Sequence, residues 1–293
     1  MSFKSYSELF LKISQNNYKV STHYKVNGII KNRLSYFFEY DISEIKPSII
    51  KNWISNINDV SIKSKKHYLG ILSQIFDLAL DDEIILKNPT KNIKLPKHQK
   101  KRIKPFSKDE VLKIIDFSKK YNDKFQIFLK LGFFTGMRTG EILALKINDI
   151  DFKAKTININ STRSRFGEST PKTFYSIRKI PLFNVIYSDL YEYVHKYKNN
   201  TYLLETQYSD PYKDDYVFSR NYWKIILKDL NLEYRRLYSM RHTFATNALL
   251  SKSLSPIELS KILGHSNCEM VYKVYVSYIN NLEKNIDFDI NIY

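Results

Sequence analysis

Residues 135–151 read TGMRTGEILALKINDID and form the most informative stretch of the chain. Three of the seven glycines fall within nine residues at or just before its start, and Arg138 lies between the last two of them. Glycine lets the backbone turn sharply and be approached closely. Glu141 follows where its carboxylate can pair with the Arg138 guanidinium and orient it. Taken alone, an arginine in a glycine-rich turn usually marks a capped helix start, so its role depends on the other segments.

Three further segments in the second half carry reactive or charged side chains. Residues 171–182 read PKTFYSIRKIPL, residues 238–246 read YSMRHTFAT, and residues 263–275 read LGHSNCEMVYKVY. Each is weak evidence by itself. A charged pair that opens an apolar helix is usually a surface feature, and most of the 23 tyrosines are expected to be packing residues with a solvated hydroxyl.

The charge of the chain indicates a polyanionic partner. Its 293 residues include 47 Lys and Arg against 30 Asp and Glu, a net charge of +17. At 293 residues the chain is long enough for one or two globular domains, and 43% of its residues are hydrophobic, as in ordinary globular proteins. So large a basic surplus disfavours an enzyme of small anions, because Lys and Arg neutralise phosphates and release counterions. A drift toward Lys, Asn, Ile and Tyr is also visible, but it does not explain the deficit of acids.

The single cysteine, Cys268, excludes an intramolecular disulfide and predicts a reducing, cytoplasmic setting. The six histidines are scattered without zinc-ligand spacing, and no GxxxxGK[ST] loop is present, so we expect neither a metal nor another cofactor. The start of the chain lacks the apolar region of a secretory signal, and no apolar stretch reaches the ~18 residues of a membrane span.

Residues 1–86 are predicted to be mostly helical, with apolar residues such as Leu72 and Phe76 at helical spacing. A basic cluster lies at the start of the helix that carries Leu72 and Phe76. It is either a solvated helix face or a patch that contacts phosphates. Its lysines are Lys63, Lys65 and Lys66.

Residues 87–105 predict a linker, since they hold eight Lys or Arg, three Pro and no acid. We therefore expect a helical domain at 1–95, a basic linker at 96–105 and a second domain at 106–293. The basic stretch is either a flexible hinge or a strap along a nucleic-acid backbone. Its candidate phosphate contacts are Lys97, Lys100, Lys101, Arg102 and Lys104.

In the second half, Ser107, Ser255 and Ser266 each begin a capping box that is predicted to open a helix. Residues 124–134 are strongly apolar and predict a buried helix. Residues 155–160 and 177–182 favour a small antiparallel sheet, because they alternate or carry β-branched side chains. The tail at 286–292 alternates strictly, which is typical of a strand buried on one face.

Taken together, the four segments resemble the tyrosine recombinase (phage integrase) family, in the right order and spacing over about residues 105–280. Residues 1–95 look like the helical, SAM-like core-binding domain of that family, and we expect no additional arm-binding module before it. The resemblance implies a mainly α fold with a small antiparallel β-sheet. It also implies two domains, a helical core-binding domain and an α+β catalytic domain, that form a C-shaped DNA clamp.

The resemblance implies site-specific DNA strand exchange without metal or ATP. Tyr275 matches the nucleophile that forms a covalent 3′-phosphotyrosyl bond, and Arg138 and Arg241 match the arginines that grip the scissile phosphate. Lys172 matches the lysine that protonates the leaving 5′-oxygen, and His265 matches the histidine that hydrogen-bonds the phosphate. Supporting positions are matched by Glu141 and His242.

The residue types suit the chemistry, because two guanidiniums hold phosphate oxygens bidentately and stay charged at every relevant pH. One position departs from the family. Tyr238 stands where the family usually has His. We keep it as a candidate catalytic residue, since a phenol can hydrogen-bond the phosphate or the nucleophile, but with a pKa near ~10 it is a poor general base at neutral pH.

Several alternatives stay open. Tyr278 is the second candidate for the nucleophile, and Lys179 competes with Lys172. Three other functions compete with strand exchange. The chain could be a type IB topoisomerase-like enzyme, a catalytically idle DNA-binding protein of the same fold, or a generic basic DNA-binding module.

The expected partners are duplex recombination sites, three further copies of the chain and possible accessory proteins, with no membrane. The resemblance implies a homotetramer on DNA. We expect the tail at 286–292 to pair with a neighbouring protomer's sheet, or to fold back in cis before assembly.

Overall fold

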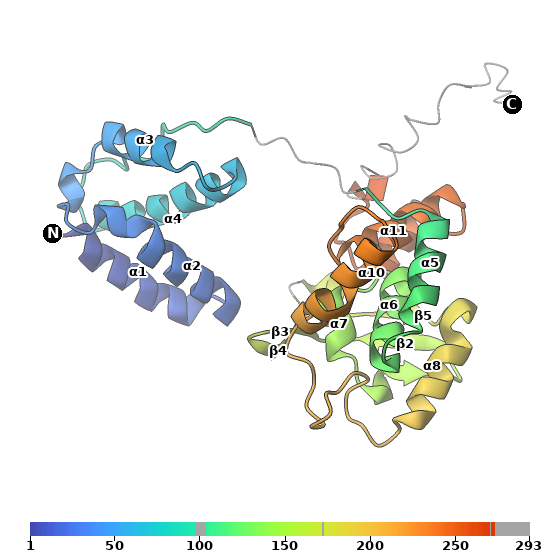
Figure 1. Ribbon diagram of the computed structural model, residues 1–293. Helices are drawn as coiled ribbons and strands as arrows, with labels where there is room; N and C mark the ends of the chain where they lie inside the picture. Colours follow the sequence, from blue (N-terminus) through green and yellow to red (C-terminus); the bar gives the residue numbers. More distant parts are fainter. Residues whose placement is uncertain (98–103, 172, 270, 273–293) are drawn as a thin grey trace, which may run out of the picture. The chain divides into compact units, whose positions relative to one another are not determined.

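The computed structural model describes residues 1–97, 104–171, 173–269 and 271–272. The chain divides into two compact units, Met1–Lys101 and Arg102–Tyr293 (Figure 1). Each unit has a hydrophobic core of its own. The division falls within the segment 96–105 that was expected to be a linker. The fold is mainly α-helical with a small antiparallel sheet, as predicted. None of the helices in the described residues is long and apolar enough to cross a membrane.

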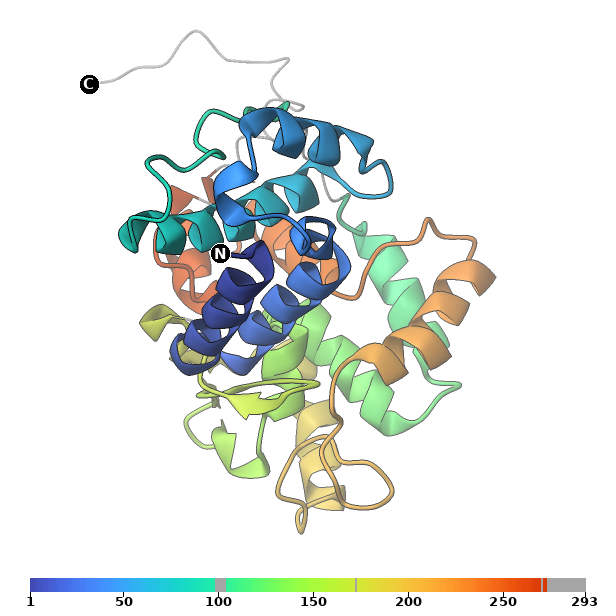
Figure 2. The same ribbon diagram turned by 90° about the vertical axis from the view of Figure 1, so that its left-hand side faces the viewer.

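The first unit is helical. α1 (Phe3–Asn17) packs beside α2 (Val20–Asn32) and against α4 (Ile62–Asp81), which Figure 2 shows from a second direction. Ser61 begins α4 by accepting a hydrogen bond from the Ser64 N–H, and α4 then buries Leu72 and Phe76 at the predicted helical spacing. The α-helices of this unit are α1 (Phe3–Asn17), α2 (Val20–Asn32), α3 (Pro47–Asn56) and α4 (Ile62–Asp81).

The prediction of a linker over all of residues 87–105 was wrong for its first part. Asn88 and Thr90 are buried, and Ile93 and Leu95 pack against the core of the first unit. The Asn88 side chain donates from Nδ2 to Asp77 Oδ1 on α4 at 2.7 Å. This segment therefore belongs to the first unit.

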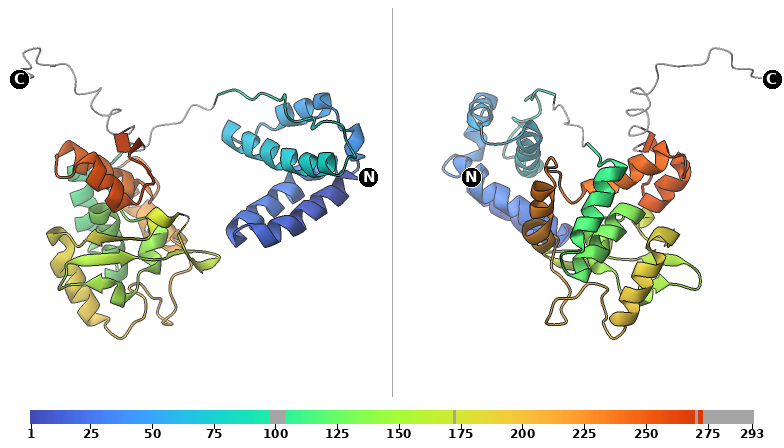
Figure 3. Two further views of the ribbon diagram at one scale, coloured as in Figure 1. Left: turned by 180° about the vertical axis from the view of Figure 1, so that it is seen from behind. Right: turned by 45° about the vertical axis from the view of Figure 1, so that its right-hand side comes forward.

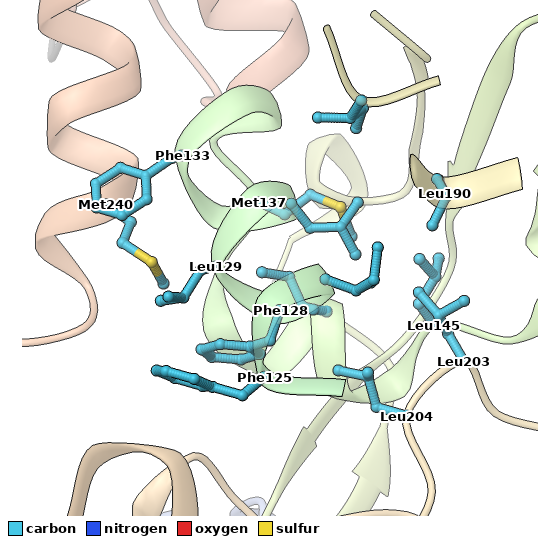
Figure 4. Packing of buried hydrophobic residues seen from close by; sticks show 14 of the residues in the cluster. Phe125, Phe128, Leu129, Phe133, Met137, Leu145, Leu190, Leu203, Leu204 and Met240 are labelled. Carbon is cyan, nitrogen blue, oxygen red and sulfur yellow. The ribbon is translucent and has the colours of Figure 1, made fainter. Parts of the chain in front are cut away.

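The second unit is built around the apolar helix α6 (Asp123–Thr135), which covers the stretch predicted to be a buried helix. α8 (Asn184–Lys196) packs against α6 (Figures 1 and 3). Leu129 and Phe133 of α6 face Met240 of α11 (Ser239–Leu250) (Figure 4). Its α-helices are α5 (Lys108–Ser118), α6 (Asp123–Thr135), α7 (Thr139–Ala144), α8 (Asn184–Lys196), α9 (Tyr216–Phe218), α10 (Lys224–Asp229), α11 (Ser239–Leu250) and α12 (Pro256–Leu263).

The predicted strands pair as expected. β2 (Thr156–Ile159) lies between β1 (Ile150–Asp151) and β5 (Arg178–Pro181) in an antiparallel sheet, with Ile157 opposite Ile180. A separate hairpin is formed by β3 (Thr162–Ser164) and β4 (Gly167–Ser169). The capping boxes predicted at Ser107 and at Ser255 are present.

Candidate active site

A cleft of about 410 Å³ in the second unit brings together three of the segments singled out in the sequence. It is lined by Arg138 and Glu141 from the start of α7 and by His265 from the turn that follows α12. Thr162 of β3 and Ser176 before β5 also line it. The cleft thus lies where the glycine-rich turn, the strands and the end of α12 meet.

Arg138 is held at the cleft by the way α6 ends. Gly136 ends α6 in the left-handed conformation, with φ +66°, and a Cβ there would lie 2.4 Å from Phe244 Cδ1. Arg138 then becomes the N-cap of α7, where its N–H donates to Glu141 Oε2 at 2.9 Å. Its Nη1 donates to Glu141 Oε1 at 2.7 Å, as the spacing predicted. One carboxylate therefore fixes both the backbone and the guanidinium of Arg138.

Glu141 is a buried carboxylate between two arginines. Its side chain is 2% exposed, and it accepts hydrogen bonds from Arg138 and from Arg178. Burial alone would raise the pKa of Glu141, but the hydrogen bonds and charges of Arg178 and Arg138 outweigh it and lower the pKa. The group is therefore ionised at neutral pH.

Arg241 reaches the same region from α11. Met240 packs against α6, and Arg241 follows it in the chain. Arg241 Nη1 donates to the carbonyl of Gly136, at the end of α6, at 2.9 Å. Its Nη2 donates to Leu263 O at 2.7 Å and lies 3.0 Å from His265 Nε2. Burial and the charge of Arg138 lower the pKa of Arg241 to about 10, which leaves the guanidinium charged at neutral pH.

His265 is neutral at pH 7, because burial and the nearby charges of Arg241, Arg138 and Arg178 lower its pKa to about 4. Arg241 can only donate, so His265 Nε2 accepts and the ring proton is assigned to Nδ1. That Nδ1 is buried and has no hydrogen-bond partner in the described part of the chain. The imidazole therefore holds one unused donor beside the two arginines.

Tyr238 and His242 lie next to Arg241 at the start of α11. Their rings meet edge to face with centroids 5.2 Å apart, and Tyr238 is 43% exposed. Burial, followed by the charge of Arg241, lowers the pKa of His242.

Two of the predicted catalytic residues, Lys172 and Tyr275, lie outside the described residues, as do Tyr278 and the tail at 286–292. The neighbours of Lys172, Pro171 and Thr173, line the cleft. Lys179 is exposed, and it pairs with Asn158 in the sheet.

Among the predicted DNA contacts, Lys63 and Lys66 are exposed near the start of α4, and Lys65 is partly buried there. Lys97 and Lys104 are exposed. Lys100, Lys101 and Arg102 lie outside the described residues.

Sequence reasoning missed Arg178, which binds Glu141 with two hydrogen bonds of 3.1 and 3.0 Å. A signal was available. Side chains alternate along a strand, so Arg178 shares the face of β5 that Ile180 buries. An arginine on a buried face needs a carboxylate or several carbonyl partners.

The chain is similar to known proteins over most of its length. The model of the phage integrase family matches residues 104–280, and that of the phage integrase N-terminal SAM-like domain matches residues 2–58. The ICEBs1 integrase of Bacillus subtilis is 28% identical over 288 residues, which cover 92% of this chain and 76% of that protein.

Two solved structures resemble the chain in fold. The Tn1549 transposon integrase in complex with a circular intermediate DNA has a TM-score of 0.80 at 20% identity, with 96% of this chain and 99% of that chain covered. A lambda integrase tetramer bound to a Holliday junction has a TM-score of 0.75 at 18% identity, with 92% and 79% covered.

Proposed function

Because this chain belongs to the phage integrase family, whose members break and rejoin DNA, we propose that it exchanges strands at specific DNA sites with Tyr275 as its nucleophile. The Tyr275 hydroxyl attacks a backbone phosphorus, and the 5′-oxygen of the next nucleotide leaves. A 3′-phosphotyrosyl bond stores the cleaved bond until the 5′-hydroxyl of another strand attacks it. No ATP is consumed, since each transesterification exchanges one phosphodiester for another.

The observation that carries this proposal is that Arg138 and His265 line one cleft and that the buried Arg241 contacts His265 there. Attack on a phosphodiester develops negative charge on the non-bridging oxygens, and fixed guanidiniums stabilise that charge best where water is excluded. Arg241 is buried and touches the His265 ring, whose Nδ1 hydrogen is unused. Arg138 and His265 line the cleft in which the phosphate is proposed to lie, and Arg241 adds its positive charge next to His265.

Lys172 is proposed as the acid that protonates the leaving 5′-oxygen. Its neighbours Pro171 and Thr173 line the cleft, which supports this role. Glu141 orients Arg138 through two hydrogen bonds and does not take part in proton transfer, because its pKa lies below the ordinary value. Tyr238, the N-cap residue of α11, is proposed to hydrogen-bond the phosphate or the nucleophile, and His242 in the first turn is proposed as a supporting residue.

The DNA is proposed to lie against both units, in keeping with a net charge of +17. Lys63, Lys65 and Lys66 would contact its backbone from the first unit, and Lys97 and Lys104 from the segment between the units. The chain is proposed to act in the cytoplasm.

We propose that four copies act on two sites, and the lambda integrase tetramer bound to a Holliday junction, which shares the fold, supports this assembly. The tail at 286–292 is proposed to link neighbouring copies. A protein truncated after residue 283 is then expected to cleave DNA and to recombine poorly. Recombination at the wild-type level by that truncated protein would remove the role of the tail.

A nicked suicide duplex tests the reaction. A binding site is first selected from a pool of duplexes, and a nick is placed near the cleavage point so that the short 5′-hydroxyl strand is lost after cleavage. The protein is expected to form a denaturation-resistant adduct, in EDTA as well, that is absent in Tyr275→Phe. Specific binding without any adduct would instead identify an idle DNA-binding protein, the reading that Tyr238 favours.

A further inference from the structure

Arg178 joins two parts of the candidate site that come from distant stretches of sequence. On one side it donates from Nη1 and Nη2 to the two oxygens of Glu141, at 3.1 and 3.0 Å. On the other side its Nε donates to the Ile262 carbonyl at 2.5 Å, at the end of α12. Its Nη1 also donates to Ser176 O at 3.0 Å. All three nitrogens of the Arg178 guanidinium therefore donate hydrogen bonds within the protein.

The contact with α12 leads directly to His265. The last carbonyls of a helix lack intrahelical partners and carry partial negative charge, so cations are favourable there. Arg178 takes the carbonyl of Ile262 and Arg241 takes that of Leu263. Gly264 then turns the chain with φ +67°, and a Cβ there would lie 3.0 Å from Arg178 Cδ. The His265 turn therefore rests on the Arg178 side chain.

Glu141 carries the same support to Arg138, because one carboxylate binds both guanidiniums. Arg178 is 6% exposed and is not among the described residues that line the cleft. It is placed to act through its neighbours and not on the DNA.

We propose that Arg178 is a positioning residue that sets the distance between Arg138 and His265 by bridging Glu141 and the end of α12. This inference rests on the proposed function for its effect on cleavage. Its geometric part is independent of that function.

The bridge requires arginine, because its planar guanidinium donates N–H groups to both Glu141 oxygens and to the Ile262 carbonyl at the same time. A lysine at this position keeps the charge but has a single ammonium, which cannot reach both Glu141 oxygens and the Ile262 carbonyl in the same geometry. Arg178→Lys is therefore expected to fold and to loosen the bridge. Arg235→Lys is the matched control, since Arg235 is also 6% exposed and binds Glu110 with both Nη atoms, at 2.8 and 3.0 Å.

The first measurement is single-turnover cleavage of the nicked duplex at saturating protein, together with the dissociation constant for DNA. Displacement of positioned groups by about 1 Å typically costs about a hundredfold in rate. Arg178→Lys is expected to slow cleavage about tenfold to a hundredfold and to leave DNA affinity within about twofold, while Arg235→Lys changes neither. In Glu141→Gln, which already breaks the bridge, adding Arg178→Lys is expected to slow cleavage little further. Cleavage by Arg178→Lys at the wild-type rate would overturn the inference and leave the proposed function intact.

The second measurement needs no activity. The ring nitrogen resonances of His265, assigned by their loss in His265→Asn, are expected to shift in Arg178→Lys and to stay in place in Arg235→Lys. If the wild-type protein forms no adduct, the proposed function fails and these resonances alone decide the bridge. Unchanged His265 resonances in Arg178→Lys would overturn it.

Discussion

Replacing Glu141 by Gln tests the electrostatic centre of the site. The change keeps the size of the side chain but removes the charge that Arg138 and Arg178 share, and it points an amide N–H at a guanidinium that can only donate. Removing one partner of a buried ion pair typically costs about 3–5 kcal/mol. In a domain of roughly 150–250 residues each kcal/mol lowers the melting temperature by about 2–4 °C. The second unit of Glu141→Gln is therefore expected to melt roughly 6–20 °C lower at pH 7.

The assay is thermal unfolding followed by circular dichroism, with Glu110→Gln as the control. Glu110 also accepts two hydrogen bonds from a buried arginine, but its side chain is 23% exposed, so its loss is expected to cost less. The pKa of Glu141 is lowered in the fold. Its ionic stabilisation is thus complete above the ordinary carboxyl pKa and is lost as the pH falls through the folded value. The gap between wild type and Glu141→Gln should narrow below about pH 4. Equal melting temperatures at pH 7 would refute the assigned role of the carboxylate.

Three further outcomes follow from the same structure. Arg241→Lys is expected to slow single-turnover cleavage by a factor of about 10²–10³. A lysine ammonium cannot replace the buried guanidinium, whose two Nη atoms donate to the carbonyls of Gly136 and Leu263. A slowing of less than about threefold would contradict this. The pKa of His265 lies at about 4 in the fold and near ~6.5 when unfolded, so the unfolded chain binds more protons between these values. Stability should therefore fall as the pH drops from about 6.5 to about 4, and His265→Asn should flatten that slope in urea titrations. Replacing Lys63, Lys65 and Lys66 by Gln should weaken binding to all DNA sequences by a similar factor. The slope of the logarithm of the binding constant against the logarithm of the salt concentration should fall by about one for each phosphate that is no longer neutralised. An unchanged slope would exclude these lysines from the DNA interface.

The parts of the site that sequence reasoning reached were local or carried by motifs. The Arg138–Glu141 pair follows from a spacing of three residues at a helix start, where side chains are neighbours. The contact between Arg241 and His265 joins residues 24 apart, and only the resemblance between whole motifs placed them together.

The parts that it missed depend on tertiary contacts. Arg178 was overlooked because its partners come from α7 and α12, although the alternation of β5 put it on the buried face. Asn88 lies in a stretch whose prolines and charges indicate a linker. Its Oδ1 accepts from the Thr90 N–H, which is local, but its Nδ2 reaches α4, which no spacing along the chain shows.

The most direct test of the account identifies the residue that becomes covalently bound to DNA. The adduct formed on the nicked duplex is digested with nuclease and protease, and the peptide that carries the nucleotide is sequenced by mass spectrometry. We expect a 3′-phosphotyrosyl bond on Tyr275. A modified Tyr278 or Tyr272 would contradict that assignment, and a nucleotide on any residue other than tyrosine would contradict the proposed chemistry.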